Sequence, residues 1–95
     1  MGQNTRLFAK QITVGSVAVA VAFPQKMNEI RIENTSTFQI RANTDAGLNS
    51  GAPTAGSSVY IGSNAHIDLP IVCSSVTCIS STGSSAAGIN VIGLG

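Results

Sequence analysis

The sequence has very few of the side chains from which active sites are built. Its 95 residues contain one His, two Cys, four acidic and five basic residues, and the charged fraction is only 9%. General acid–base and nucleophilic catalysis require titratable groups that neighbouring groups can pair with and tune. We therefore expect that the chain is not an enzyme and that it works through surface contacts.

Clustered positive charge and long apolar runs are also missing. The basic residues are scattered and the formal net charge is +1, whereas nucleic acids and anionic lipids are bound by grouped Lys and Arg side chains. The longest apolar stretch, residues 17–23, is too short to span a bilayer, and no signal peptide is visible. We expect no nucleic acid and no membrane among the partners, and synthesis in the cytoplasm.

Cysteine is scarce, and the two cysteines have two interpretations. Cys73 and Cys78 could close a small disulfide loop, or they could be two buried thiols, which is the usual state of free Cys. Disulfides are uncommon without a secretory route. With His66 as the only His, a zinc site would lack ligands. We therefore expect no metal and no cofactor, and the disulfide remains an open alternative.

The remaining polar candidates have structural interpretations. His66 and Asp68 lie two residues apart, so on a strand they would share one face. This spacing could orient an imidazole, but no GxSxG motif places a nucleophile, and we interpret the pair as part of a solvated strand face. Asn34 begins a glycosylation sequon, although a role as a turn residue explains it better.

The sequence is rich in alternation of apolar with polar or small residues, and it has no helical period. Period-two alternation is typical of strands with one buried face. Gly, Ser, Asn and Pro separate the alternating segments, which indicates turns between short strands. We predict strands at residues 11–14, 17–22, 29–33, 38–42, 59–61, 67–69, 76–79 and 89–92.

Seven or eight short strands joined by such turns predict an all-β fold, namely a small antiparallel β-sandwich or a jelly-roll-like barrel. We expect an N-terminal arm at residues 1–9 and a single β-sandwich domain at residues 10–95. Because only 4% of the residues are aromatic, the core must be aliphatic, and oligomerisation is a common remedy for so modest a core. The predicted core contains Val14, Val19, Ile30, Ile32, Phe38, Ile40, Ile61, Ile67, Leu69, Ile79 and Val91.

Residues 29–42 predict a hairpin. A register with Ile30 opposite Ile40 and Ile32 opposite Phe38 keeps these apolar residues on one face. The same register pairs Glu29 with Arg41, which is favourable across two strands. The turn would then be centred on Thr35.

Two segments near the N-terminus predict contacts with a neighbouring subunit. The arm ends in Leu7 and Phe8, and exposed apolar residues of this kind often dock onto a partner. The segment 17–23 alternates Val with Ala, so Ala18 and Ala20, together with Ala22, would form a flat face that permits close approach. The alternative is a central strand that is covered on both faces.

A third candidate contact lies in the long segment at residues 43–58, which has no period and is expected to be a loop. Leu48 is its only large apolar residue. We expect Leu48 to anchor the loop against a neighbour, and the alternative is a floppy surface loop.

From Ile30 onward the sequence resembles the small β-sandwich virion proteins of tailed bacteriophages. The resemblance rests on RIENTSTFQIRA, SSVYIGSN, HIDLP, VTCISST and GINVIGLG, and the earlier KQITVGSVAVAV fits the same scheme. One departure is Thr77, where the family often has an aromatic residue. The family has no catalytic residues, so the resemblance transfers none.

The resemblance implies a capsid decoration (cement) protein or another accessory virion protein. Such a protein would be located in the virion, bind the major capsid protein or another virion protein, and form a homo-oligomer. The alternative is a ligand-binding or adhesive β-module of a tail, fibre or cell-surface assembly. Sugar binding usually requires exposed aromatic residues, and the chain has no Trp and one Tyr.

Overall fold

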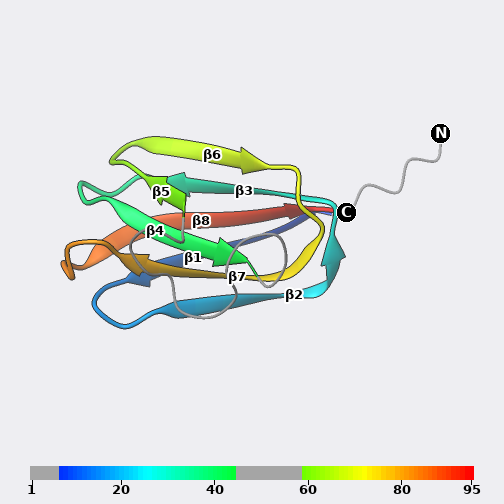
Figure 1. The fold of residues 1–95 in the computed structure, drawn as a ribbon, viewed down its shortest axis with the longest axis horizontal. Helices are drawn as coiled ribbons and strands as arrows, with labels where there is room; N and C mark the ends of the chain where they lie inside the picture. Colours follow the sequence, from blue (N-terminus) through cyan, green and yellow to red (C-terminus); the bar gives the residue numbers. More distant parts are fainter. Residues whose placement is uncertain (1–6, 45–58) are drawn as a thin grey trace.

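The computed structural model describes residues 7–44 and 59–95. Within these ranges the chain forms eight β-strands and no helix (Figure 1). The predicted all-β fold is confirmed, and each predicted segment corresponds to one strand. The strands are β1 (Leu7–Val14), β2 (Val19–Met27), β3 (Glu29–Asn34), β4 (Ile40–Thr44), β5 (Val59–Ile61), β6 (Ala65–Leu69), β7 (Cys73–Ser80) and β8 (Ala86–Leu94).

The strands form two four-stranded antiparallel sheets. Sheet A has the order β1-β8-β3-β6, and sheet B has the order β2-β7-β4-β5. Thus β1 pairs with β8, β2 with β7, β3 with β6 and β4 with β5. This nested pairing describes one long hairpin folded over into two layers, which is the topology of a jelly roll.

The predicted hairpin at residues 29–42 is wrong. β3 pairs with β6 and β8 in sheet A, whereas β4 pairs with β5 and β7 in sheet B. The connection at residues 35–39, here called the crossing, therefore passes from one sheet to the other. Ile30, Ile32 and Ile40 still point into one core, but they do so from opposite sheets, and alternation alone cannot distinguish the two arrangements.

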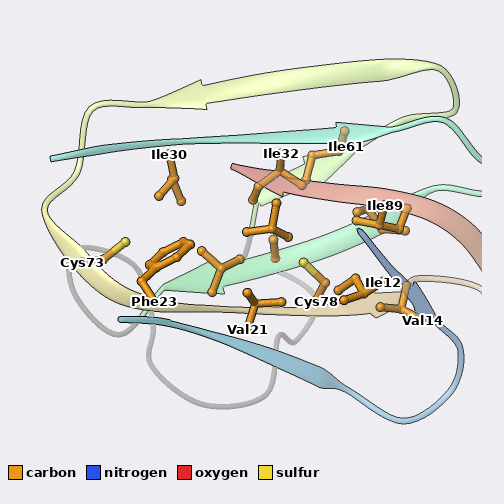
Figure 2. Packing of buried hydrophobic residues seen from close by; sticks show 14 of the residues in the cluster. Ile12, Val14, Val21, Phe23, Ile30, Ile32, Ile61, Cys73, Cys78 and Ile89 are labelled. Carbon is orange, nitrogen blue, oxygen red and sulfur yellow. The ribbon is translucent and has the colours of Figure 1, made fainter. Parts of the chain in front are cut away.

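The core fills the space between the two sheets. Figure 2 shows Ile30 and Ile32 of sheet A pointing toward the layer that carries Val21 and Phe23 of sheet B. Each strand contributes alternate residues because successive side chains point to opposite faces of a sheet. The buried cluster consists of Ile12, Val14, Val21, Phe23, Met27, Ile30, Ile32, Ile40, Ala42, Ile61, Cys73, Val76, Cys78, Ala86, Ile89 and Val91.

Most of the predicted core is confirmed. Val19, Ile67 and Leu69 are only partly buried and pack against the cluster, because β2 and β6 are edge strands. Phe38 lies in the crossing with 37% of its surface exposed. Ile79 lies on the outer face of β7, because Cys78 and Ser80 on either side of it are the buried residues. The core predictions for Phe38 and Ile79 are therefore wrong.

The start of the domain also differs from the prediction. Residues 7–9, expected in the arm, form the beginning of β1, where Leu7 lies opposite Leu94 and Phe8 opposite Gly93. The Phe8 ring packs edge-on against Phe23 with the ring centroids 5.4 Å apart. Gly93 makes this packing possible, because a Cβ atom there would lie 3.2 Å from Phe23 Cε1 and closer still to Met27. Residues 1–6 of the arm lie outside the described residues.

The predicted loop begins later than expected. Asn43 and Thr44 belong to β4, and both are buried. The rest of that segment, including Leu48, lies outside the described residues.

Candidate interaction surfaces

β1 and β2 form two open edges on one side of the sandwich. β1 is the edge strand of sheet A, β2 is the edge strand of sheet B, and the two strands contact each other (Figure 1). Leu7 and Phe8 lie on β1, Ala20 lies on β2, and Ala18 directly precedes β2. Four of the predicted interface residues thus lie on these two edge strands or directly before one of them.

β2 has a core face and an outer face. Val21 and Phe23 are buried and Val19 packs against the core, whereas Ala20 and Ala22 are exposed. In the described sheet β2 has one neighbour, β7, so the alternative of a central strand covered on both faces is wrong. The predicted flat Ala face is the outer surface of an edge strand.

Leu7 belongs to an apolar patch on the outer face of sheet A. The register places Leu7 opposite Leu94 and Ala9 opposite Ile92, and all four side chains point away from the core. Leu7 is 68% exposed, whereas Ile92 and Leu94 are half-buried. We call these four residues the outer apolar patch. Sequence reasoning missed Ile92 and Leu94 because their grouping with Leu7 depends on the pairing of β1 with β8.

Polar side chains cover the neighbouring part of the same face. By register, Gln11, Asn90, Glu33 and His66 form one row across the four strands. Gln11 Nε2 donates to Asn90 Oδ1 at 3.1 Å, and Asn90 Nδ2 donates to Glu33 Oε1 at 3.3 Å. Arg31 Nε lies 3.1 Å from the other carboxylate oxygen of Glu33. These contacts connect the side chains of β1, β8 and β3.

His66 and Asp68 share the outer face of β6, as predicted from their spacing. His66 Nε2 lies 3.8 Å from Asp68 Oδ2, and Arg31 Nε lies 3.9 Å from Asp68 Oδ1. Both β6 side chains are more than half exposed, and exposed pairs of this kind contribute about 0–1 kcal/mol. In the described part of the chain, no group of three or more His, Cys, Asp or Glu side chains is arranged to hold a metal ion.

An open hollow of about 250 Å³ lies at one end of this polar row. Asn64 has a left-handed backbone conformation with φ of 57°, which Asn adopts more readily than most residues. The Ala65 N–H donates to the carbonyl of Gly62 at 3.2 Å and closes the same turn. The hollow offers carboxylate, imidazole, amide and hydroxyl groups to a polar ligand. Its lining residues are Glu33, Asn34, Thr35, Asn64, Ala65 and His66.

Asn34 holds the crossing in place beneath this hollow. It is 1% exposed, and its Nδ2 donates to the carbonyls of Phe38 at 2.7 Å and Ile61 at 3.1 Å. Its Oδ1 accepts from the Ser36 N–H at 3.0 Å and from Ser36 Oγ at 2.6 Å. A sugar attached to Nδ2 would disrupt these contacts, so in the folded protein Asn34 is a structural residue rather than a glycosylation acceptor.

Cys73 and Cys78 are buried and are not joined in a disulfide. They lie five residues apart along one strand, a span of about 16 Å that no disulfide can bridge. Burial raises the pKa of the Cys78 thiol to about 12. Because the thiolate is the reactive form, Cys78 is expected to be chemically inert at neutral pH.

Comparison with known proteins does not assign a function. No family model, no curated protein and no solved structure matches the chain. Over residues 7–44 and 59–95, no helix is long and apolar enough to cross a membrane.

Proposed function

We propose that the chain is a structural protein of a bacteriophage particle, a decoration protein that binds the assembled capsid as a homo-oligomer and stabilises it. The observation that carries this proposal is the outer apolar patch beside the two open edges. The jelly-roll topology supports it, because viral capsid domains are among the proteins that use this architecture. Many unrelated functions share one fold, so the exposed surface is the more specific support.

Attachment would depend mainly on apolar contact. Full burial of the Leu7 side chain contributes about 1.5–3 kcal/mol before ordering costs. Phe8, predicted with Leu7 as a contact residue, packs against Phe23 within the same molecule. A decoration protein seated across a boundary between capsid subunits stabilises the shell because separation of the subunits must also break its contacts.

The test is co-sedimentation of the purified protein with empty capsids of the phage that encodes it. We expect L7Q to weaken binding about tenfold, and V72Q to have little effect although Val72 is also an exposed apolar residue. Binding should change little between about 0.05 and 0.5 M NaCl because few charges take part. Point substitution is preferred to deletion of residues 1–8, which would also remove the contact of Phe8 with Phe23.

Two results would contradict the proposal. One is absence of the chain from the mass spectrum of purified phage particles. The other is binding that moderate salt abolishes, because this would indicate an electrostatic attachment that the exposed surface does not explain.

A second candidate function is a ligand-binding or adhesive β-module of a tail, fibre or cell-surface assembly. The hollow lined in part by Glu33, Asn64 and His66 favours it, and lectin domains also use the jelly roll. Titration of ¹⁵N-labelled protein with glucose, galactose and N-acetylglucosamine tests it by NMR. Shifts confined to the hollow, lost in N64A and retained in Q11A, would support this function over decoration.

A further inference from the structure

We infer that β2 pairs with β2 of a second copy of this chain, antiparallel about a two-fold axis at Ala20, so that two copies of sheet B join into one continuous sheet. The inference specifies the self-association in the proposed function and rests on that function for its biological role. The pairing itself is a property of the isolated protein and is tested there.

β2 offers a straight edge of limited length. From Val19 to Ala22 it pairs regularly with β7, so its other side presents unpaired backbone groups in the same regular spacing within the described sheet. Beyond Ala22 the register shifts, and Pro24 has no N–H to donate. An open edge of this kind is a template for another extended strand. The segment that can pair is therefore short and centred near Ala20.

The other edge strands of the described sheets carry features that oppose such pairing. On β1, Lys10 lies opposite the buried Val91, and a charge at an inward-facing position of an edge strand discourages a partner. β6 is five residues long and exposes His66 and Asp68, and β5 is only three residues long. By contrast, residues 17–22 contain neither a charged residue nor proline. The edge of β2 is thus the least protected of the four.

The sequence of β2 indicates that its partner is a second copy. The five residues centred on Ala20 read Ala-Val-Ala-Val-Ala, which is symmetrical about that residue. Antiparallel pairing about Ala20 places Ala18 opposite Ala22 and Val19 opposite Val21. The same residue types then meet on each face, as a two-fold interface requires of a self-complementary surface.

The side chains beside the edge are compatible with a close approach of two backbones. Ala20 and Ala22 are exposed and short, so they do not obstruct a strand at the usual spacing of about 4.8 Å. Val17, which is 75% exposed, lies directly before this edge and would be removed from water in the pair. Val19 and Val21 already face the core side, so the apolar inner face continues from one copy into the next.

Sedimentation equilibrium of the isolated protein from about 1 µM to about 1 mM tests the inference, and the wild type is expected to form a dimer reversibly. A20K places two Lys side chains opposite each other at the axis and should raise the dimer dissociation constant by about tenfold or more. T13K is the matched control, because Thr13 is an exposed residue of the edge strand β1. T13K should leave the dimer dissociation constant unchanged. Circular dichroism verifies that each variant is folded, and A22K replaces A20K if the latter is not.

A second measurement fixes the register. In A20C the new thiol would lie opposite the same thiol of the second copy. The Cα atoms of the two residues would be about 4.5–5.5 Å apart, which is within disulfide reach, so mild oxidation should give a covalent dimer. T13C should not form one, and the native thiols are buried.

A monomeric wild type at every concentration, or equal weakening by A20K and T13K, would overturn the inference. The two proposals fail separately. A protein that dimerises through β2 but does not bind capsids refutes the decoration function alone. A protein that binds capsids without dimerising refutes the β2 pairing and leaves the capsid attachment standing.

Discussion

Replacement of Asn34 by alanine is expected to destabilise the protein by about 3–4 kcal/mol. Alanine removes every side-chain bond of a residue that is 1% exposed. Ser36 Oγ lies 3.0 Å from the carbonyl of Phe38, so once Asn34 Oδ1 is gone it can donate there and satisfy that group. The Ile61 carbonyl and the Ser36 N–H lose their Asn34 partner, and a buried unsatisfied group costs about 1–3 kcal/mol.

The measurement is urea denaturation followed by circular dichroism at one fixed protein concentration. A domain of this size has a free energy of unfolding of about 5–14 kcal/mol, so N34A should keep a transition at a lower urea concentration. N90A is the matched control, because Asn90 also forms side-chain hydrogen bonds but lies on the outer face of sheet A. We expect N90A to cost less than about 1 kcal/mol. Equal losses in the two variants would refute the reasoning that the buried bonds of Asn34 hold the crossing.

Three further predictions concern the core and a glycine of β8. I32A should cost about 2–4 kcal/mol through lost burial and a cavity, and an unchanged melting temperature would show that Ile32 is not buried. Because the Cys78 thiol ionises near 9.0 when unfolded and near 12 when folded, stability should be complete below pH 9 and fall above it. Between pH 8 and pH 10 the wild type should lose about 1 kcal/mol more than C78V in urea titrations, and identical losses would contradict the buried thiol. G88A should destabilise by about 1–3 kcal/mol, because Gly88 has φ of 84° and a Cβ there would collide with Thr35 Oγ1. G62A should change stability little, since nothing lies within 4 Å of the added Cβ atom. Thermal melts of G88A and G62A compare the two variants.

The alternation of apolar and polar residues predicts all the strands because it is a local property of the chain. It does not predict which strands pair. β3 and β4 show the same alternation whether they form a hairpin or face each other across a core, and the favourable pair of Glu29 with Arg41 supported the wrong choice. In the structure Glu29 lies opposite Leu94 of β8, whereas Arg41 lies between Tyr60 of β5 and Ile79 of β7. The buried hydrogen bonds of Asn34 hold the crossing between the sheets. They could not be predicted from the sequence, because one of them requires the Ile61 carbonyl, 27 residues away, to lie beside Asn34.

The candidate contacts show the same limit. Leu7 could be found from the sequence because it adjoins a polar segment. Its grouping with Ile92 and Leu94 depends on a register that joins distant segments, as in the bond between Gln11 and Asn90, which are 79 residues apart. The inward packing of Phe8 could not be predicted either, because it requires the space that Gly93 leaves in a strand near the other end of the chain.

The nested pairing of the strands has a consequence for the order of synthesis. β2 leaves the ribosome long before β7, its neighbour in the described sheet. The interval between the synthesis of β1 and that of its partner β8 is longer still. Non-local pairing of this kind is intrinsically slow, and unpaired edges are prone to aggregate while they wait. On a polysome, the charge-free part of β2 would therefore meet identical segments of neighbouring nascent chains before it meets β7. The yield of folded protein should depend on how densely ribosomes are loaded, and slower initiation or lower temperature should raise it.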